Sequence, residues 1–319
     1  MKIFISVLWI SLCLIVTPSS FACPKPDDIA PCTCFKATIY CQEPNITLPY
    51  LERIMKNVSA GFYQRILLKN LKLGNLSLEI FENVDVNMLE IIECELSGII
   101  SSNRVLPVFG DTLREIHVYR SINDTKGDFT LDLKSVPRLH TLVLYYSSIP
   151  LLRSVWFPKS LNSVTHLRIY KSGIEQFENK VFQNLINLEE LDLSSNKLQN
   201  ISRSLLPKPA NSLKTLDFSD NIITDVPEDF FSEMMSLETV SFHNNRIRIL
   251  PEIIWGSVWS QLKELRLDGN PLACGSEIEW MFNAKRPSRL FGSCAEPPER
   301  KYQYMQYIID EHNRRKDLK

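Results

Sequence analysis

One spacing of apolar residues recurs along most of the chain and constrains its fold more than any other feature. The segment LEELDLSSNKL, which begins at Leu188, has leucine at its first, fourth, sixth and eleventh positions and asparagine at its ninth. Comparable segments start 24 to 26 residues apart. Their first residues are Tyr63, Leu89, Leu113, Leu139, Val164, Leu188, Leu213, Leu237 and Leu262. A period this steady over nine units predicts a stack of similar structural units.

The fourth and sixth positions of each unit predict a short strand. Both positions are apolar, as in Leu191 and Leu193, with polar residues beside them, and such alternation is typical of a strand with one buried face. Strands of adjacent units would lie about 4.8 Å apart. The motif resembles the leucine-rich repeat. The resemblance implies an α/β solenoid with a curved parallel sheet on its concave face and short helices or irregular segments on its convex face.

The ninth position of each unit is expected to stabilise the turn that follows the strand. Asparagine occupies it in the last four units, at Asn196, Asn221, Asn245 and Asn270. A buried amide can both donate and accept hydrogen bonds to backbone groups there. The first five units have Leu71, Ser97, Ser121, Ser147 and Ser172 instead. A hydroxyl serves only part of that role, so we expect the N-terminal half to be less regular.

The first 22 residues read as a secretory signal peptide. Lys2 precedes an apolar run from Ile3 to Val16, and Ser20 and Ala22 suit cleavage after Ala22. An uncleaved anchor is the less favoured alternative, because the run is shorter than a membrane span. No second such run follows and the C-terminal residues are charged, so the sequence predicts a secreted, extracellular protein without a membrane anchor.

Five Asn-x-Ser/Thr sequons are candidate glycosylation sites in an exported protein. Their asparagines are Asn45, Asn57, Asn75, Asn123 and Asn200. Asn123 falls where its unit should have an inward apolar residue, so Ile122 is expected to take that place through a local bulge.

Cysteines flank the repeats. Cys23, Cys32, Cys34 and Cys41 predict a disulfide framework with three possible pairings. The pattern CP…CTC…C resembles the N-terminal cap of extracellular leucine-rich repeat proteins, which implies the bridges Cys23–Cys34 and Cys32–Cys41. Cys274 and Cys294, with Trp280 between them, resemble a reduced C-terminal cap and imply one bridge, Cys274–Cys294.

The predicted organisation has five parts. They are a signal peptide at 1–22, an N-terminal cap at 23–62, nine repeats at 63–272, a C-terminal cap at 273–298 and a charged tail at 299–319. The tail is expected to form a short helix against the cap or, less favoured, a partner-binding segment.

Charge and motifs argue against several classes of function. The chain has 36 basic and 37 acidic residues, so no net field favours nucleic acid or an anionic membrane. It has none of the motifs for metal-dependent hydrolysis, for a serine nucleophile or for phosphate and dinucleotide binding. We therefore expect a protein that is not an enzyme, with no cofactor and no metal.

The residues that alternate with the buried leucines should line the concave face. The column after the second buried strand residue reads Lys69, Glu95, Tyr119, Tyr145, Tyr170, Ser194, Ser219, His243 and Asp268. Three tyrosines on consecutive strands, with basic neighbours, predict a docking site for a protein partner. The residues assigned to it are Tyr119, Tyr145, Tyr146, Tyr170, Arg120, Arg168, His117, His140 and His166. Two alternatives remain open. Tyrosine is a good strand residue without any ligand, and the histidines could form a metal site or proton switch.

Units six and seven supply an acidic zone beside the tyrosines, formed by Glu189, Glu190, Asp192, Asp217 and Asp220. Taken as a whole, the chain resembles small secreted leucine-rich repeat proteins of arthropods. Some of these are non-catalytic subunits that associate with the catalytic subunit of an enzyme. That resemblance implies a binding or scaffold protein that engages another extracellular protein through its concave face, as an accessory subunit. The alternative is innate-immune recognition of microbial glycans or lipoproteins.

Overall fold

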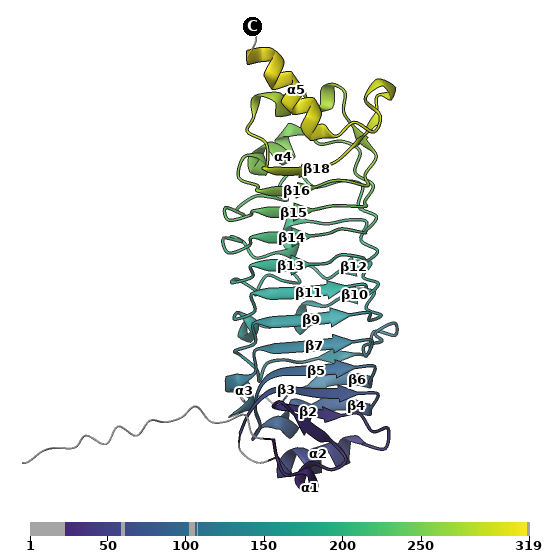
Figure 1. Cartoon of the computed structure of the whole chain (residues 1–319), viewed down its shortest axis with the longest axis vertical. Helices are drawn as coiled ribbons and strands as arrows, with labels where there is room; N and C mark the ends of the chain where they lie inside the picture. Colours follow the sequence, from purple (N-terminus) through teal and green to yellow (C-terminus); the bar gives the residue numbers. More distant parts are fainter. Residues whose placement is uncertain (1–22, 59–60, 102–105, 107, 318–319) are drawn as a thin grey trace, which may run out of the picture.

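The chain forms a single curved stack of strands in the computed structural model, which describes residues 23–58, 61–101, 106 and 108–317. The predicted signal peptide lies outside these residues. One 12-stranded sheet runs the length of the stack (Figure 1). In spatial order its strands are β1 (Thr33–Phe35), β2 (Thr38–Cys41), β3 (Phe62–Lys69), β5 (Asp85–Ile92), β7 (Glu115–Tyr119), β9 (Thr141–Tyr145), β11 (His166–Tyr170), β13 (Glu190–Asp192), β14 (Thr215–Asp217), β15 (Thr239–Ser241), β16 (Glu264–Arg266) and β18 (Arg289–Phe291).

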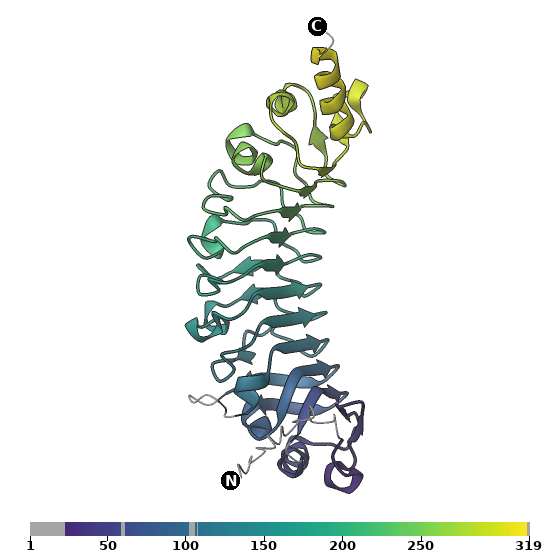
Figure 2. The ribbon, with the colours of Figure 1, turned by 60° about the vertical axis from the view of Figure 1, so that its left-hand side comes forward.

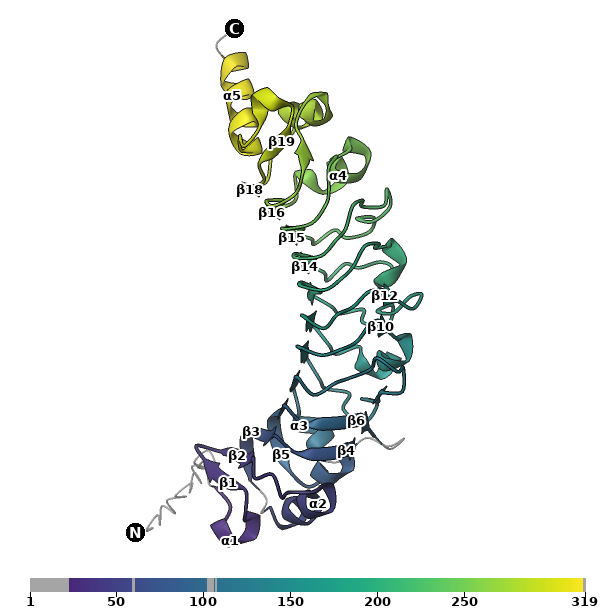
Figure 3. The same cartoon turned by 90° about the vertical axis from the view of Figure 1, so that its right-hand side faces the viewer.

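The large sheet lines the concave side of the arc, as predicted (Figure 3). All its neighbours pair in parallel except β1 and β2, which are antiparallel. Strand β2 pairs in parallel with β3 and so extends the sheet into the N-terminal cap. Strand β18 was not expected; it extends the sheet past the ninth unit, because Leu290 pairs in register with Leu265.

The opposite side of the stack is more ordered than expected in its N-terminal half. Two short parallel sheets lie there. They comprise β4 (Lys72–Ser77), β6 (Glu95–Ile100) and β8 (Thr130–Leu131), and β10 (Leu151–Leu152) and β12 (Gln176–Phe177). The expected short helices are α3 (Phe109–Thr112), α4 (Glu252–Trp259) and the 3₁₀ helices η1 (Leu78–Phe81), η2 (Ser154–Trp156), η3 (Lys159–Leu161) and η4 (Arg203–Leu205).

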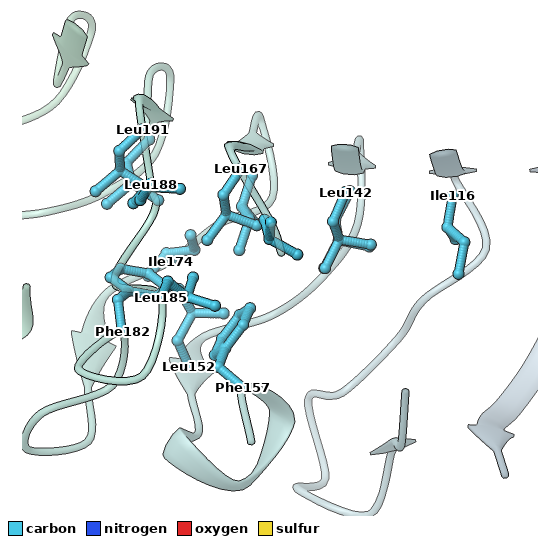
Figure 4. Close-up of a cluster of buried hydrophobic side chains, with 14 of the residues drawn as sticks. Ile116, Leu142, Leu152, Phe157, Leu167, Ile174, Phe182, Leu185, Leu188 and Leu191 are labelled. Atoms are coloured by element: carbon cyan, nitrogen blue, oxygen red, sulfur yellow. The ribbon is translucent and has the colours of Figure 1, made fainter. Parts of the chain in front are cut away.

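The core lies between these two sides and repeats from unit to unit. Ile116, Leu142, Leu167 and Leu191 point inward from four consecutive strands and are fully buried (Figure 4). Behind them the rings of Phe157 and Phe182 pack with centroids 5.1 Å apart. Each unit thus buries apolar surface against its neighbours, and the stack needs a cover only at its ends.

The ends are covered by caps whose bridges agree with the resemblance stated above. The disulfides are Cys23–Cys34, Cys32–Cys41 and Cys274–Cys294. The N-terminal cap adds helices α1 (Pro26–Ile29) and α2 (Leu48–Asn57). The C-terminal cap adds the 3₁₀ helices η5 (Ser276–Asn283) and η6 (Pro298–Arg300) and the strands β17 (Leu272–Ala273) and β19 (Cys294–Glu296).

The predicted tail contains the helix α5 (Met305–Asp317), which packs against the C-terminal cap rather than projecting from it. Met305 and Ile309 are fully buried, and Arg286 in the cap pairs with Asp310 at 2.8 Å. The purple N-terminal cap and the yellow helix α5 close opposite ends of the stack (Figure 2).

The register of the second unit corrects the sequence-based one. Strand β5 pairs Val86 with Tyr63 and Leu89 with Ile66, so the unit begins at Val86 and not at Leu89. The sequence was ambiguous because Leu89, Ile92 and Cys94 also have apolar spacing. Cys94 therefore occupies the ninth position instead of Ser97, and Ile92 replaces Glu95 in the concave column, where it pairs with Tyr119.

Two further expectations concern single positions. Ile122 is buried while Asn123 is exposed, so the predicted local shift is confirmed. All five sequon asparagines are exposed, and none lies in a strand of the large sheet.

Candidate partner-binding surface

Three tyrosines form a continuous row of rings on the concave face, which we call the tyrosine ladder (Tyr119, Tyr145, Tyr170). Parallel pairing places Tyr119 beside Tyr145 and Tyr145 beside Tyr170. The first two rings meet edge to face at 5.7 Å, and the second two stack at 4.2 Å. Such contacts stabilise a fixed arrangement of the rings. The sequence-predicted column is therefore a contiguous aromatic surface.

A second row lies beside the ladder, one residue further along each unit. We call it the cation–π cluster (Arg120, Tyr146, Lys171). The backbone of these residues is left-handed, with φ between 48° and 53°, which ends each strand. The Arg120 guanidinium carbon lies 4.8 Å from the Tyr146 ring centroid, and the Lys171 Nζ lies 5.3 Å from it. All three side chains are exposed, so charged and aromatic groups border the ladder.

His117 lies in the middle of β7, two residues before Tyr119, and contacts the Tyr119 hydroxyl. Its Nδ1 lies 3.4 Å from the Tyr119 hydroxyl, and its Nε2 lies 3.1 Å from a carboxylate oxygen of Glu115. Burial lowers the pKa of His117 below its ordinary value of 6.5, against the opposing effect of Glu115 and Glu90. Because burial outweighs those carboxylates, the imidazole is neutral at pH 7 and can bond the Tyr119 hydroxyl.

The hydroxyls of Tyr119 and Tyr170 remain protonated at neutral pH. Burial raises the pKa of Tyr119 and of Tyr170 above the ordinary value of 10. Nearby negative charge at Glu90 adds to the effect for Tyr119, and Tyr145 adds to it for Tyr170. These two residues therefore carry neutral hydroxyls on the concave face.

Arg168 has a carboxylate partner on the neighbouring strand. Its Nε and Nη2 donate to the two carboxylate oxygens of Glu190, at 2.6 and 3.1 Å. This bidentate pair raises the pKa of Arg168 and neutralises the junction between the basic and acidic zones. Arg168 thus lies beside the ladder, but its charge is matched within the protein.

The structure does not bring the other two predicted histidines into the ladder. His166 lies at the start of β11, where its Nδ1 is 2.9 Å from the Thr165 hydroxyl. His140 precedes β9, and its Nδ1 is 2.7 Å from the carbonyl oxygen of Arg138. At about 3.3 Å per strand residue, His140 is roughly 16 Å along the chain from Tyr145. The site therefore divides into the ladder with its cluster and a separate group at the strand starts.

The acidic zone adjoins the ladder on the C-terminal side. Asp192 and Asp217 are direct neighbours across β13 and β14. Burial raises the pKa of Asp192, and the charge of Asp217 adds to the effect. The concave face thus changes from donors and cations over β7–β11 to carboxylates over β13–β14.

The sequence places Arg120, Tyr146 and Lys171 around the tyrosines, although only Arg120 and Tyr146 were assigned to the docking site. The signal was present, because Arg120, Tyr146 and Lys171 occupy the same position in three consecutive units. Ile92, which lies next to Tyr119, was not predicted to face the concave side, because the sequence-based register of the second unit was wrong.

Models of known families match the regular C-terminal units. Two models, both described as leucine rich repeat, match residues 187–208 and 211–272. Among curated proteins, the non-catalytic subunit of Oplophorus-luciferin 2-monooxygenase from Oplophorus gracilirostris is 21% identical over 301 residues, 84% of this chain and 81% of that protein.

Other curated relatives match less of the chain. A leucine-rich repeat and fibronectin type III domain-containing protein 1-like protein of Danio rerio is 31% identical over 39% of this chain and 19% of its own length. Leucine-rich repeat-containing protein 3 of Danio rerio is 31% identical over 40% of this chain and 47% of its own length. The matches therefore span less than half of both of these relatives.

Solved structures share the architecture. One is an octameric complex of Latrophilin 3, Unc5D and the leucine-rich repeat part of FLRT2, with a TM-score of 0.61, 17% identity and coverage of 88% of this chain and 96% of that one. Another is the Drosophila Toll–Spätzle complex, with a TM-score of 0.59, 18% identity and coverage of 81% and 34%. At these identities the likeness establishes the fold.

Two broader conclusions follow from the structure and these matches. The expectation that the chain is not an enzyme is supported, because the models that match describe leucine-rich repeats and the relative matched over most of the chain is named a non-catalytic subunit. Across the described residues, no helix is long and apolar enough to span a bilayer. The chain is a leucine-rich repeat solenoid with a disulfide-bonded cap at each end.

Proposed function

We propose that the protein is a secreted, non-catalytic binding protein that holds another extracellular protein on its concave face. The observation that carries the proposal is the tyrosine ladder, whose rings contact one another and whose Tyr145 ring also contacts Tyr146 of the cation–π cluster, on a sheet whose strands contain no sequon. Tyrosine and arginine dominate binding energy at protein interfaces, because they bury a large area with few torsions to freeze.

The comparisons support an accessory role. The relative that matches most of this chain is named a non-catalytic subunit, and the two solved structures are complexes between proteins. Three disulfides suit an oxidising, extracellular compartment. We therefore include in the proposal cleavage after Ala22 and glycosylation of the exposed sequon asparagines, away from the concave sheet.

The glycan-binding alternative is less favoured at this surface. A sugar that stacks on tyrosine needs an open ring face. The Tyr145 ring instead contacts the rings of Tyr119, Tyr146 and Tyr170, at 5.7, 4.5 and 4.2 Å. The central ring of the ladder therefore has neighbours where a sugar would stack, which suits a protein surface better than a sugar face.

The test is capture with a matched control. The tagged mature chain is incubated with the extracellular fluid of its source, the co-purifying protein is identified and purified, and its affinity is measured. Tyr145→Ala with Tyr170→Ala should weaken binding at least tenfold, by removing about 1.4 kcal/mol or more. Tyr304→Ala with Tyr307→Ala removes two exposed tyrosines at the start of the C-terminal helix, Tyr304 just before α5 and Tyr307 within it, and should leave affinity unchanged.

The proposal is wrong if both double variants, folded by circular dichroism, bind the partner like the parent. Binding to microbial surfaces with no stoichiometric protein partner would instead favour recognition of microbial glycans or lipoproteins.

A further inference from the structure

The cation–π cluster has a fixed internal spacing. Arg120, Tyr146 and Lys171 come from three consecutive units, so the two cations flank the tyrosine from opposite sides. Two strand spacings of about 4.8 Å each place the two cations about 10 Å apart. Contact with the ring limits how far either side chain can move, so the pair presents two positive charges at a defined separation.

Neither cation is strongly committed to a carboxylate of the protein. Among the described residues, no carboxylate lies within ion-pair distance of Lys171. Arg120 pairs with Glu93 at 3.1 Å, but both side chains are well exposed, and an exposed pair of this kind contributes little. Both cations are therefore available to an anionic group of a partner at little cost.

The ligand chemistry follows from what surrounds the two charges. The ladder hydroxyls beside them are donors, and the Tyr146 ring faces are covered by the cations. Donors and cations together recognise acceptors that carry negative charge, such as side-chain carboxylates. A polyproline II helix rises about 3.1 Å per residue with three residues per turn, so carboxylates at positions i and i+3 lie about 9 Å apart on one side.

We propose that the cation–π cluster binds an acidic segment of the protein partner in a polyproline II conformation, with two carboxylates three residues apart that contact Arg120 and Lys171. This inference rests on the proposed function and names the chemistry of its partner. The segment runs along the solenoid axis over β7–β11. It does not continue as an acidic segment over β13, because Asp192 and Asp217 would repel it.

Two synthetic peptides of equal composition test the spacing. One contains Glu-Pro-Pro-Glu and the other Glu-Glu-Pro-Pro, each with glycines at both ends and blocked termini, titrated to millimolar concentration by NMR. The first should bind at least fivefold more tightly, and added salt should weaken its binding. Equal affinities, or no binding of either peptide, would overturn the inference.

Charge reversal locates the site. Lys171→Glu should reduce affinity for the Glu-Pro-Pro-Glu peptide at least tenfold. The fold tolerates glutamate in this left-handed position, because Glu93 occupies it in the second unit. Lys159→Glu, at an exposed lysine of η3 outside the large sheet, is the matched control and should have no effect. Equal losses in both variants would assign the binding to net charge and overturn the inference.

The captured partner separates this inference from the proposed function. If Tyr145→Ala with Tyr170→Ala abolishes partner binding while Lys171→Glu does not, the acidic segment is wrong and the docking surface stands. If neither variant changes partner affinity, both proposals fail.

Discussion

The N-terminal and C-terminal units close the same turn with different chemistry. In the C-terminal half, the Asn221 amide donates to the carbonyl oxygens of Leu193, Phe218 and Ser219, at 3.0 to 3.1 Å, and accepts the N–H of Leu198 at 2.9 Å. Asn196, Asn245 and Asn270 make similar sets of bonds. One side chain thus ties two units together.

The second to fifth units have smaller side chains at the same position. The Ser121 hydroxyl donates to the Tyr119 carbonyl oxygen and accepts the N–H of Cys94. The Cys94 thiol lies 3.4 and 3.5 Å from the carbonyl oxygens of Ile92 and Leu68. Burial raises the pKa of Cys94 to about 11, so it remains a thiol that donates weakly and contributes less to the turn than an amide.

The N-terminal half, which lacks the hydrogen bonds of the asparagines, has longer strands in the large sheet. In this sheet, β3, β5, β7, β9 and β11 have five to eight residues, while β13 to β16 have three. Strands β13 and β14 end at Asp192 and Asp217, each of which accepts the backbone N–H of the second residue after it, at 2.8 Å. A side-chain bond of this kind favours a turn over continued pairing of the strand with its neighbours. His117, Val143 and Arg168 stand in their place in the other half, so those strands continue to the tyrosines.

The less regular half is therefore the one that carries the candidate site. Extension of the strands to Tyr119, Tyr145 and Tyr170 places all three rings in paired register, which a three-residue strand would not do. The comparison teaches that the units without the asparagine are also those with longer strands in the large sheet, and that three of these strands carry the ladder.

The largest expected effect in this comparison is loss of an asparagine. Asn221→Ala leaves three carbonyl oxygens and one N–H without their side-chain partner in a buried turn. We expect a loss of about 3 kcal/mol in the free energy of unfolding, measured by urea denaturation. Gln199→Ala, at an exposed position nearby, is the control and should change stability by less than about 0.5 kcal/mol. A loss below about 1 kcal/mol for Asn221→Ala would show that the amide is not what joins the units.

Much of this fold could be predicted from sequence, because the repeat fixes where each strand lies and which of its side chains point into the core. The third to ninth units, the two caps and the inward place of Ile122 followed from spacing or from the resemblance. The second register did not, because Leu89 can begin a unit as well as Val86 can, and only pairing with Tyr63 decides. The ion pair between Arg168 and Glu190 depends on side-chain conformation across strands, which spacing does not reveal.

The ladder should respond to pH through His117. Its pKa is lowered by burial, so the unfolded chain binds the proton first as the pH falls below about 6.5. The stability contributed by this group is thus present above that pH and is lost as the pH falls toward the folded-state pKa. Glu115, Glu90, Arg168 and Tyr119 face the ring.

His117→Gln should remove that part of the pH dependence, about 1 kcal/mol or less between pH 7.5 and 5.5. The measurement is the melting temperature of both proteins across this range. His140→Gln changes an exposed histidine outside the ladder and should preserve the parent profile. Parallel profiles for His117→Gln and the parent would mean that His117 does not titrate differently on folding.

The acidic zone should have a smaller effect on stability, and its pH dependence should have the opposite sign to that of His117. Asp192→Asn keeps an oxygen that can accept the Ser194 N–H and removes a carboxylate whose pKa burial raises beside Asp217. Because the raised pKa means that ionisation opposes folding above the ordinary pKa, neutralisation should stabilise the protein at pH 7, by about 0.5 kcal/mol. At pH 3 the parent and the variant should be equally stable. A destabilised variant at pH 7 would mean that the charge strengthens the turn.

The smallest effect is expected at the ninth position of the fourth unit. Ser147 is buried, and within the described part of the chain its hydroxyl has no hydrogen-bond partner. Its backbone N–H donates instead to the Ser172 hydroxyl at 3.4 Å, a bond that alanine would keep. Ser147→Ala should therefore lie between no change and a gain of about 1 kcal/mol in urea denaturation, since it removes an unsatisfied polar group. A loss of stability as large as that of Asn221→Ala would mean that serine stabilises this turn as much as asparagine does. The longer strands would then have no missing hydrogen bonds to compensate for.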